Sequence, residues 1–322
     1  MKLCGDIGGT KVLLGLVDDA GNIAGQRRPA RGLAPRRLAS ADFSDFASLL
    51  GEFLRGVGAN ISGGCLAVAG PVADDGRSAK ITNLPWTIDA AALEREFAIG
   101  PGRLRLINDF AGAAMGVTAL APDELVTLQA GEPLASGVKL VLGAGTGLGM
   151  AVLVADRGDW RVLPGEGGHV GFAPADEVQA RVWAALLREH GRVTNERVIS
   201  GPGLEAIHRI LADETIDAAT ITERALAGGD AAARHSVDVF IKAYGAFAGD
   251  MAMALMARGG VYLAGGIAAK ILPLLQSGAF IEAFNAKAEH ALLAARMPVH
   301  VVTDPLLGLR GAARLALGEA QE

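Results

Sequence analysis

Two glycine-rich turns have the composition of phosphate-binding loops. One lies at residues 5–10 and the other at residues 143–147. Backbone N–H groups can approach a phosphate closely where no Cβ intervenes, and a threonine hydroxyl adds a further donor. Each turn alone could be a simple hairpin connection, but the pair could hold the β- and γ-phosphates of a nucleotide. The residues concerned are Gly5, Asp6, Gly8, Gly9 and Thr10 in the first turn, and Gly145 and Thr146 in the second.

The first turn also contains a carboxylate, Asp6, which a phosphate alone would repel. Its position is explained if Mg²⁺ lies between the carboxylate and the phosphates, because Mg²⁺ prefers oxygen ligands. Neither turn has the Gly-Lys-Ser/Thr ending of a P-loop or the Gly-x-Gly-x-x-Gly spacing of a dinucleotide site. The two turns therefore indicate nucleotide binding of another kind.

Asn108 and Asp109 lie where an apolar strand is expected to end and a helix to begin. This is the place where α/β proteins put ligand-binding groups. Asp109 could be a general base that takes a proton from an attacking hydroxyl. It could equally be the N-cap of the following helix, which is a frequent position for aspartate.

Residues 163–170 form the densest polar cluster of the chain and include Glu166 and His169 within a glycine-rich loop. Together with Asn108 and Glu196, these groups could hydrogen-bond several hydroxyls of a sugar. A metal site is the competing interpretation, but one histidine and two distant carboxylates lack a familiar ligand spacing. Glu196 by itself could also lie in the solvated start of a helix.

Three further features have a binding interpretation and a structural one. Gly265 and Gly266 follow an apolar strand and could let adenine or ribose lie against the backbone, or could simply form a strand-to-helix turn. Five arginines within residues 27–37 indicate a solvated loop, with anion binding as the alternative. Cys4 and Cys65 lie in apolar runs and are expected to be unreactive core residues.

Short strands that alternate with helices are expected to position these groups, which predicts an α/β fold. Apolar runs that end in turns predict strands at residues 2–4, 12–17, 66–69, 104–107, 139–142, 150–154 and 261–264, with a weaker strand after a turn at 18–22. Helical spacing predicts helices at residues 43–57 (capped by Ser40 or Ser44), from about 110, and at 176–190, 203–212, 219–228, 231–257 and 307–317. The opening strand–turn–strand pattern recurs in the second half, which indicates a duplicated nucleotide-binding module with a cleft between the halves.

Composition excludes several classes of protein. The 322 residues include 30 Lys and Arg against 35 Asp and Glu, a formal net charge of −5, whereas nucleic-acid binders are normally basic. Two cysteines cannot form a disulfide framework, so we expect a cytoplasmic location. No secretory leader is visible, and the most apolar stretch, around residues 243–269, contains Asp250 and Arg258 and falls short of a membrane span.

Taken together, these motifs resemble the bacterial glucokinase family within the hexokinase/actin-like ATPase superfamily. The matches occur in the order of the family and cover nearly the whole chain. They are residues 5–10 (Gly-Asp-Ile-Gly-Gly-Thr), 82–83 with Trp86, 107–110 (Ile-Asn-Asp-Phe), 143–149 (Gly-Ala-Gly-Thr-Gly-Leu-Gly), 164–169 (Pro-Gly-Glu-Gly-Gly-His), 196–198 with 200–203, and 263–267 (Leu-Ala-Gly-Gly-Ile).

The resemblance implies a two-domain actin-like ATPase (ribonuclease H-like) fold with a duplicated core and an interdomain cleft. Its small domain would span residues 1–108, completed by a C-terminal helix at 306–322, and its large domain residues 109–305. It implies transfer of the γ-phosphoryl group of ATP to the 6-hydroxyl of D-glucose, with Mg²⁺ near Asp6. Asp109 would be the catalytic base, and the sugar would be bound by Asn83, Asn108, Asp109, Glu166, His169 and Glu196. ATP would be bound by both glycine turns and by Gly265 and Gly266.

Two related protein classes fit less well. ROK sugar kinases and repressors carry a cysteine-rich zinc motif, but no cysteine follows Cys65 here, so His169 is expected to be free for sugar. A helix-turn-helix segment for DNA is also not visible, so a repressor is not expected. A kinase for another hexose or N-acetylhexosamine and a nucleotide switch of the actin or heat-shock-chaperone type remain the alternatives. A homodimer is a further expectation of the resemblance. Polyphosphate is an alternative to ATP as donor, because some relatives accept it, and the arginine-rich segment is the only hint of it here.

Overall fold

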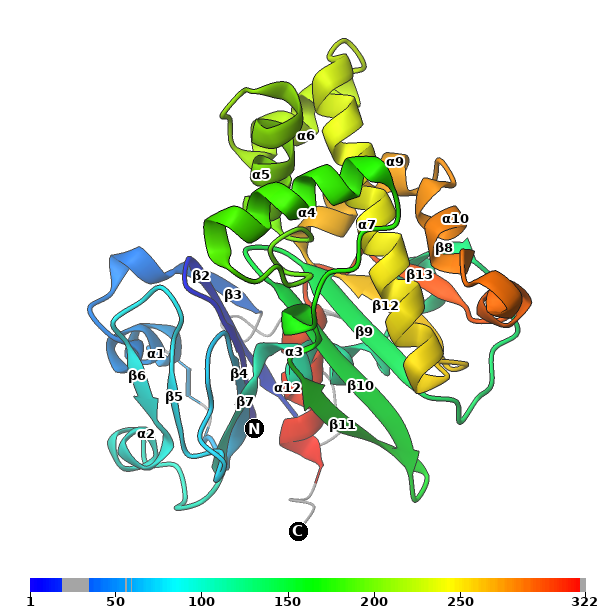
Figure 1. Ribbon diagram of the computed structural model, residues 1–322. Helices are drawn as coiled ribbons and strands as arrows, with labels where there is room; N and C mark the ends of the chain where they lie inside the picture. Colours follow the sequence, from blue (N-terminus) through cyan, green and yellow to red (C-terminus); the bar gives the residue numbers. More distant parts are fainter. Residues whose placement is uncertain (19–34, 56, 59, 319–322) are drawn as a thin grey trace. The chain divides into compact units, whose positions relative to one another are not determined.

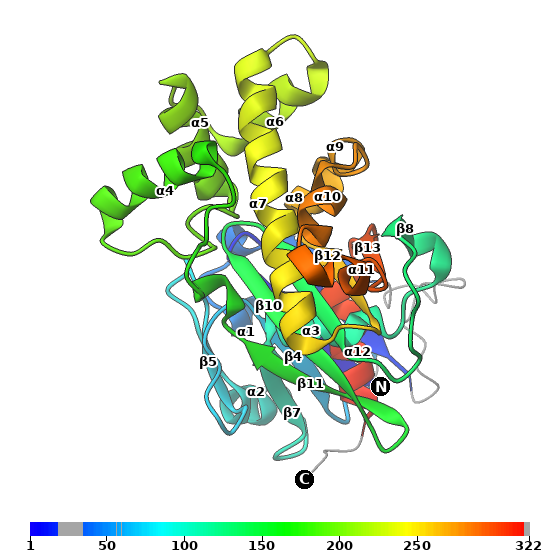
Figure 2. The same cartoon turned by 45° about the vertical axis from the view of Figure 1, so that its right-hand side comes forward.

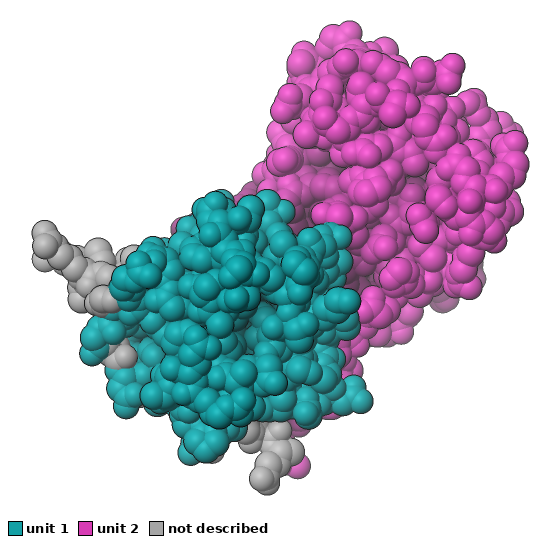
Figure 3. All heavy atoms as spheres, turned by 90° about the vertical axis from the view of Figure 1, so that its left-hand side faces the viewer, with its two compact units in different colours: residues 1–120, 304–322 teal, residues 121–303 magenta. Residues whose placement is uncertain are grey.

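The described residues form two compact units. The computed structural model describes residues 1–18, 35–55, 57–58 and 60–318. Unit 1 comprises residues 1–120 and 304–322, and unit 2 comprises residues 121–303, as coloured in Figure 3. The weak strand expected after the turn at 18–22, and residues 27–34 of the arginine-rich segment, lie outside the described residues.

Unit 1 contains a five-stranded sheet in the order β3-β2-β1-β4-β7 (Figure 1). The strands β1, β4 and β7 are parallel neighbours, whereas β2 and β3 are added antiparallel at one edge. The strands are β1 (Lys2–Ile7), β2 (Lys11–Val17), β3 (Arg36–Ala39), β4 (Gly64–Val68) and β7 (Leu104–Asn108), with a separate pair β5 (Ser78–Lys80) and β6 (Thr87–Asp89). Two arginines of the segment expected to be a loop, Arg36 and Arg37, therefore lie in a strand, because β3 pairs with β2.

Helices cover both faces of this sheet. One face is packed with α1 (Phe46–Leu54) and α2 (Ala90–Glu96) in an apolar core that includes Leu66 and Trp86. Two further helices pack on the sheet of unit 1, α3 (Asp109–Val117) and the C-terminal helix α12 (Leu307–Leu317). They lie side by side in Figures 1 and 2. A 3₁₀ turn, η1 (Ser40–Asp42), precedes α1.

The contact between α3 and α12 depends on glycine. A Cβ on Gly311 would overlap the carbonyl of Gly112, and a Cβ on Gly116 would overlap the carbonyl of Leu307. Without these side chains the two backbones approach closely. Since α3 packs against α12 and β4, the unit boundary follows Leu120 and does not fall at residue 108, where the sequence placed it.

One helix start also differs from the expectation. The sequence suggested Ser40 or Ser44 as the cap of the first helix, but α1 begins after Asp45, whose Oδ1 accepts the Ser48 backbone N–H at 2.7 Å. Ser44 instead donates its hydroxyl to the Asp45 carboxylate. The carboxylate therefore caps the helix and the serine supports the cap.

Unit 2 contains a six-stranded sheet in the order β11-β10-β9-β12-β13-β8. As in unit 1, two antiparallel strands (β11, β10) precede three parallel neighbours (β9, β12, β13), and here an antiparallel β8 is added at the far edge. The strands are β8 (Leu125–Gln129), β9 (Lys139–Ala144), β10 (Leu148–Asp156), β11 (Asp159–Gly165), β12 (Gly260–Ala264) and β13 (Val299–Val302).

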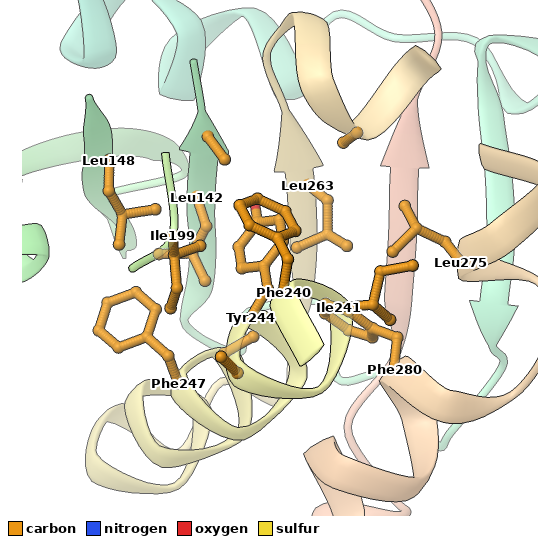
Figure 4. Close-up of a cluster of buried hydrophobic side chains, with 14 of the residues drawn as sticks. Leu142, Leu148, Ile199, Phe240, Ile241, Tyr244, Phe247, Leu263, Leu275 and Phe280 are labelled. Carbon is orange, nitrogen blue, oxygen red and sulfur yellow. The ribbon is translucent and has the colours of Figure 1, made fainter. Parts of the chain in front are cut away.

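The helices of unit 2 pack around α7 (Ala231–Leu255), the longest of those described. Its Phe240 and Tyr244 point toward Leu142 and Leu263 of the sheet, and its Phe247 lies on the side of Ile199 and Leu148 (Figure 4). The other helical segments are α4 (Glu177–His190), α5 (Gly201–Ala212), α6 (Ala218–Ala227), α8 (Gly266–Lys270), α9 (Leu272–Leu275), α10 (Ala279–Asn285) and α11 (Ala291–Ala294), with 3₁₀ turns η2 (Pro122–Glu124), η3 (Gly167–His169) and η4 (Ala288–His290). Among the residues that the structure describes, no helix is both long and apolar enough to span a membrane.

Candidate active site

The first glycine turn joins β1 to β2 in unit 1. It is closed by a hydrogen bond from the Gly8 N–H to the Lys11 carbonyl at 3.0 Å, and Ser40 donates its hydroxyl to the Gly8 carbonyl. Thr10 is exposed at the tip of the turn. Gly5 was expected to be part of the phosphate-binding turn, but it lies within β1. A Cβ added to Gly5 would lie 2.8 Å from the Leu66 side chain. Core packing therefore explains the glycine at that position.

Asp6 lies near the end of β1, and α12 leaves room for its carboxylate. A Cβ on Gly308 would be only 2.7 Å from the Asp6 Oδ2, so any larger residue there would press on the carboxylate. Burial raises the pKa of the Asp6 carboxyl, and the positive charge of Lys11 lowers it by a smaller amount. Lys11 therefore balances the negative charge of this buried carboxylate only in part. A divalent cation bound to Asp6 would offset the free-energy cost of burying that charge.

The structure decides which of the neighbours Asn108 and Asp109 caps the helix. The N-cap of α3 is Asn108, whose Oδ1 accepts the backbone N–H of Phe110 at 2.9 Å and of Ala111 at 3.4 Å. Asp109 is the first helical residue, so its possible role as the cap is not the one observed. Because the cap engages Oδ1, the Asn108 amide presents its NH₂ group to any ligand.

Asp109 has the electrostatic properties of a general base. Burial raises the pKa of its carboxyl to about 6, and the negative charge of Asp6 adds to this effect. Hydrogen bonds from the Phe110 backbone and from the Asn108 side chain partly oppose the shift. A carboxyl with a pKa near 6 is mostly ionised at neutral pH and still basic enough to accept a proton in a transition state.

Asn83 is brought next to the first glycine turn. A Cβ on Gly9 would lie 3.0 Å from the carbonyl oxygen of Thr82 and 3.6 Å from the Asn83 Cβ. Asn83 is exposed and has a φ of 66°, a left-handed conformation that asparagine tolerates better than most residues. It lines a surface hollow of about 510 Å³ between Pro71 and the segment 80–85.

In unit 2, the second glycine turn and the Gly265–Gly266 pair lie at the same edge of the sheet. The Gly265 Cβ position is 2.9 Å from the Ala144 carbonyl, and its φ of 87° favours glycine. A Cβ on Gly145 or Gly266 would contact no protein atom within 4 Å. Internal packing therefore does not require glycine at these two positions, whereas the close approach of a ligand to the backbone would.

Glu166 and His169 lie in and beside η3, at the end of β11. The Glu166 carboxylate is 4.0 Å from the His169 Nε2, and the two side chains are 87% and 57% exposed. With so few protein partners, both side chains are available to a ligand. Among the described residues no group of three or more His, Cys, Asp or Glu side chains could hold a metal ion, which does not support the alternative of a metal site formed by protein groups alone.

Glu196 has a more structured role than a solvated helix start. It lies in a turn that precedes α5, and its Oε2 accepts the Leu148 backbone N–H at 2.9 Å. Its own N–H donates to the Gly168 carbonyl at 2.9 Å. Glu196 thereby contacts both the strand that follows the second glycine turn and the loop that carries His169.

Two groups near the site were missed by the sequence reasoning. Gly308 lies about three hundred residues from Asp6 in the chain, so no local pattern could connect them. Gly201 donates its N–H to the Gly145 carbonyl at 2.8 Å, at the start of α5. The Ser200-Gly201-Pro202-Gly203 sequence does contain a signal, because serine followed by an early proline is typical of a helix start.

Comparisons with known proteins identify one family along nearly the whole chain. A sequence model of the glucokinase family matches residues 3–319. A glucokinase of Trichormus variabilis is 37% identical over 348 residues, covering 98% of each chain, and one of Chromohalobacter salexigens is 38% identical over 320 residues, covering 96% of this chain and 95% of its own. The crystal structure of a glucokinase from an Antarctic psychrotroph superposes with a TM-score of 0.84 at 30% identity, with 98% of both chains covered.

Proposed function

The chain belongs to the glucokinase family and is an ATP-dependent glucokinase, and we propose that Asp109 is the base that activates the 6-hydroxyl of D-glucose. The observation that carries this proposal is the environment of the Asp109 carboxyl, where burial and the neighbouring Asp6 raise the pKa to about 6. Such a pKa is close to the range in which a general base works best at neutral pH.

The reaction is an in-line phosphoryl transfer. The O–H bond at C6 of glucose breaks and its proton passes to the Asp109 carboxylate. The freed oxygen forms a bond to the γ-phosphorus of ATP, while the bond from that phosphorus to the oxygen shared with the β-phosphate breaks. The products are glucose 6-phosphate and ADP, and the proton on Asp109 returns to water.

The other sugar contacts are assigned by chemistry. The NH₂ group of Asn108 is not used by the helix cap, and besides the N–H that faces the Asp109 carboxylate it has a second N–H that can donate to a hydroxyl. The exposed Glu166 and His169 can accept and donate. Glu196 has one carboxylate oxygen engaged by Leu148 and a second for the sugar. Asn83 is adjacent to the first glycine turn and completes the set. Mixed donors and charged acceptors of this kind suit a polyol.

The nucleotide contacts follow from the backbone. The N–H groups of Gly8 and Gly145 close their own turns, so residues 9–10 and 146–147 offer backbone N–H groups to the phosphates. Gly265 with Gly266 offers an open backbone to the adenosine. Asp6 is the carboxylate that would hold Mg²⁺, which supplies charge neutralisation for the transferred phosphoryl group. One carboxylate and the substrate phosphates are a common ligand set for this ion.

We also infer that the core is duplicated. The support is the matching sequence of strand neighbours in the two sheets, β3-β2-β1-β4-β7 in unit 1 and β11-β10-β9-β12-β13 in unit 2, with the same antiparallel and parallel pairs. A glycine turn joins β1 to β2 in unit 1, and a glycine turn joins β9 to β10 in unit 2. A homodimer is proposed from the family resemblance, and light scattering on the purified protein tests it. A cytoplasmic location is proposed from the low cysteine content.

The proposal is tested by coupled ADP release with Mg-ATP against glucose, fructose, mannose, N-acetylglucosamine, N-acetylmannosamine and no sugar. We expect turnover that strongly favours glucose. If the enzyme prefers another hexose, Asp109 remains the proposed base, but the residues proposed to bind the sugar hydroxyls must be reassigned. Slow hydrolysis of ATP that is indifferent to every sugar would contradict the proposal and favour a nucleotide switch. Replacing ATP by polyphosphate in the same assay tests the donor.

A further inference from the structure

A short segment of unit 2 joins the sugar-binding loop to the second glycine turn. We refer to residues 193–201 as the bridge segment. On its first side it is hydrogen-bonded to the loop 168–172: Phe172 N–H donates to the Val193 carbonyl, and the backbone and side-chain N–H groups of Asn195 both donate to the Val170 carbonyl. The Glu196 N–H donates to the Gly168 carbonyl at 2.9 Å. The loop that carries His169 is therefore fixed to the bridge segment along its length.

On its second side the bridge segment holds the glycine turn. The Glu196 Oε2 accepts the Leu148 N–H at 2.9 Å, directly after the turn, and the Gly201 N–H donates to the Gly145 carbonyl at 2.8 Å. Ser200 donates its hydroxyl to the Glu196 carbonyl at 2.7 Å, which ties the two contacts together. The phosphate-binding turn is thus held at both of its ends by residues of one segment.

The fit between Glu196 and the turn is close. A Cβ on Gly147 would lie 2.6 Å from the Glu196 Oε2, so the carboxylate occupies the space that a side chain at Gly147 would need. A charged acceptor for a backbone N–H is stronger than a neutral one, and losing it leaves the N–H without that partner. The carboxylate is therefore suited to fix the conformation of the turn.

We propose that Glu196 is a positioning residue for the nucleotide as well as a sugar ligand, and that through it glucose and ATP strengthen each other's binding. This inference rests on the proposed function. A sugar hydroxyl bound to the second carboxylate oxygen would restrain Glu196, and a restrained Glu196 would restrain the turn that meets the phosphates. Because coupling between two ligands is reciprocal, a bound nucleotide must tighten glucose by the same factor.

The test measures binding of Mg-ADP by titration calorimetry, with and without saturating glucose, so that it needs no turnover. Glu196→Ala removes the acceptor of the Leu148 N–H and should weaken Mg-ADP by about tenfold even without glucose. Glu196→Gln keeps an oxygen acceptor and should restore Mg-ADP binding to within about threefold of the original enzyme. The matched control is Glu124→Ala, which likewise removes a carboxylate acceptor of a backbone N–H, that of Ala121 at 2.7 Å, but outside the proposed site, and which should leave Mg-ADP binding unchanged.

A Glu196→Ala enzyme that binds Mg-ADP as tightly as the original would overturn the proposal and leave Glu196 as a sugar ligand only. This failure is distinct from failure of the kinase function, which the sugar panel on the unmodified enzyme reports. Thermal denaturation of each variant shows that it is folded before titration.

A double-mutant cycle gives a second readout that does not depend on Glu196→Ala alone. Gly147→Ala pushes on the Glu196 carboxylate and should weaken Mg-ADP in the original enzyme. In the Glu196→Ala background the same substitution meets no carboxylate, so its effect should be several-fold smaller. Independent effects of the two substitutions would contradict the proposed contact.

Discussion

Asp6 and Asp109 lie in the same unit, and the negative charge of Asp6 acts together with burial to raise the pKa of the Asp109 carboxyl to about 6. The two carboxyls come from different strand ends, β1 and the β7–α3 junction. Their roles differ in the proposal, because one would face Mg²⁺ and the other the sugar hydroxyl. Their proximity makes each sensitive to the charge of the other.

Replacing the proposed base should slow the reaction strongly and leave the protein folded. Asp109→Asn should lower kcat by roughly 10²-fold to 10⁴-fold, which is the usual contribution of a general base. The helix should persist, because Asn108 and not Asp109 is its N-cap. Steady-state kinetics with a thermal melt checks both points, and near-normal turnover in a folded variant would remove Asp109 from the mechanism.

Activity should fall on the acid side of neutral pH. The base must be ionised to accept a proton, and the raised pKa of Asp109 places its protonation near pH 6 instead of near pH 4. Below that value kcat/KM for glucose should decrease by about tenfold for each pH unit. The measurement is a pH–rate profile at saturating Mg-ATP. An acid limb near pH 4 would show that the carboxyl which acts has an ordinary pKa.

The C-terminal helix should influence Mg²⁺ binding. Gly308→Ala places a Cβ 2.7 Å from the Asp6 Oδ2 and should displace the carboxylate, so that activity falls at least tenfold or needs more Mg²⁺. Alanine normally favours a helix over glycine, so a loss of stability from propensity is not the cause. The control is Gly318→Ala at the other end of α12, where the nearest atom is at 3.8 Å. Equal behaviour of the two variants in an Mg²⁺ titration would contradict the role assigned to Gly308.

A buried ion pair should make unit 1 sensitive to acid. The Glu94 carboxylate accepts hydrogen bonds from Arg77 at 2.6 and 2.9 Å and from the Gly102 and Leu104 backbone N–H groups. Burial opposes the charge, but the hydrogen bonds from Arg77 and the backbone prevail and lower the pKa of Glu94 to about 2. A lowered pKa stabilises the fold above the unfolded value near 4.5, and this contribution is lost as the pH falls toward 2.

Glu94→Ala should therefore destabilise the protein by about 2 kcal/mol at pH 7, since it removes the charged partner of Arg77 and leaves the Gly102 and Leu104 N–H groups without their acceptor. The difference from the original enzyme should shrink below pH 4. Urea denaturation at several pH values provides the measurement, and a difference that does not depend on pH would contradict the assignment.

Much of unit 2 could be predicted from the sequence because its signals are local. The helices α4, α6 and α7 begin after Asp176, Asp217 and Asp230, each of which caps its helix, and the spacing of apolar residues marks where they run. The C-terminal helix was predicted at residues 307–317 and is found there. Such features depend on neighbours within a few positions in the chain.

The parts that could not be predicted depend on distant residues. No local pattern shows that Glu196 accepts from Leu148, because the pair is separated by 48 positions and only the fold brings them together. The same holds for Gly308 and Asp6. At residues 125–129 and 299–302 the strands β8 and β13 pair with each other, a contact that sequence periodicity does not indicate. Candidate site residues could therefore be named from the sequence, but their contacts could not.

The packing of α12 on β1 and α3 has a consequence for how the chain matures during synthesis. Residues 1–120 are synthesised before unit 2, but the helix that closes their sheet and backs Asp6 is synthesised only after unit 2. Until then the backbone of α3 at Gly112 and Gly116 lacks the α12 residues Gly311 and Leu307 that pack on it, and a nascent chain is exposed to aggregation at that surface. An enzyme terminated before residue 307 would hold every proposed catalytic side chain and still lack the helix that supports Asp6, the proposed magnesium ligand.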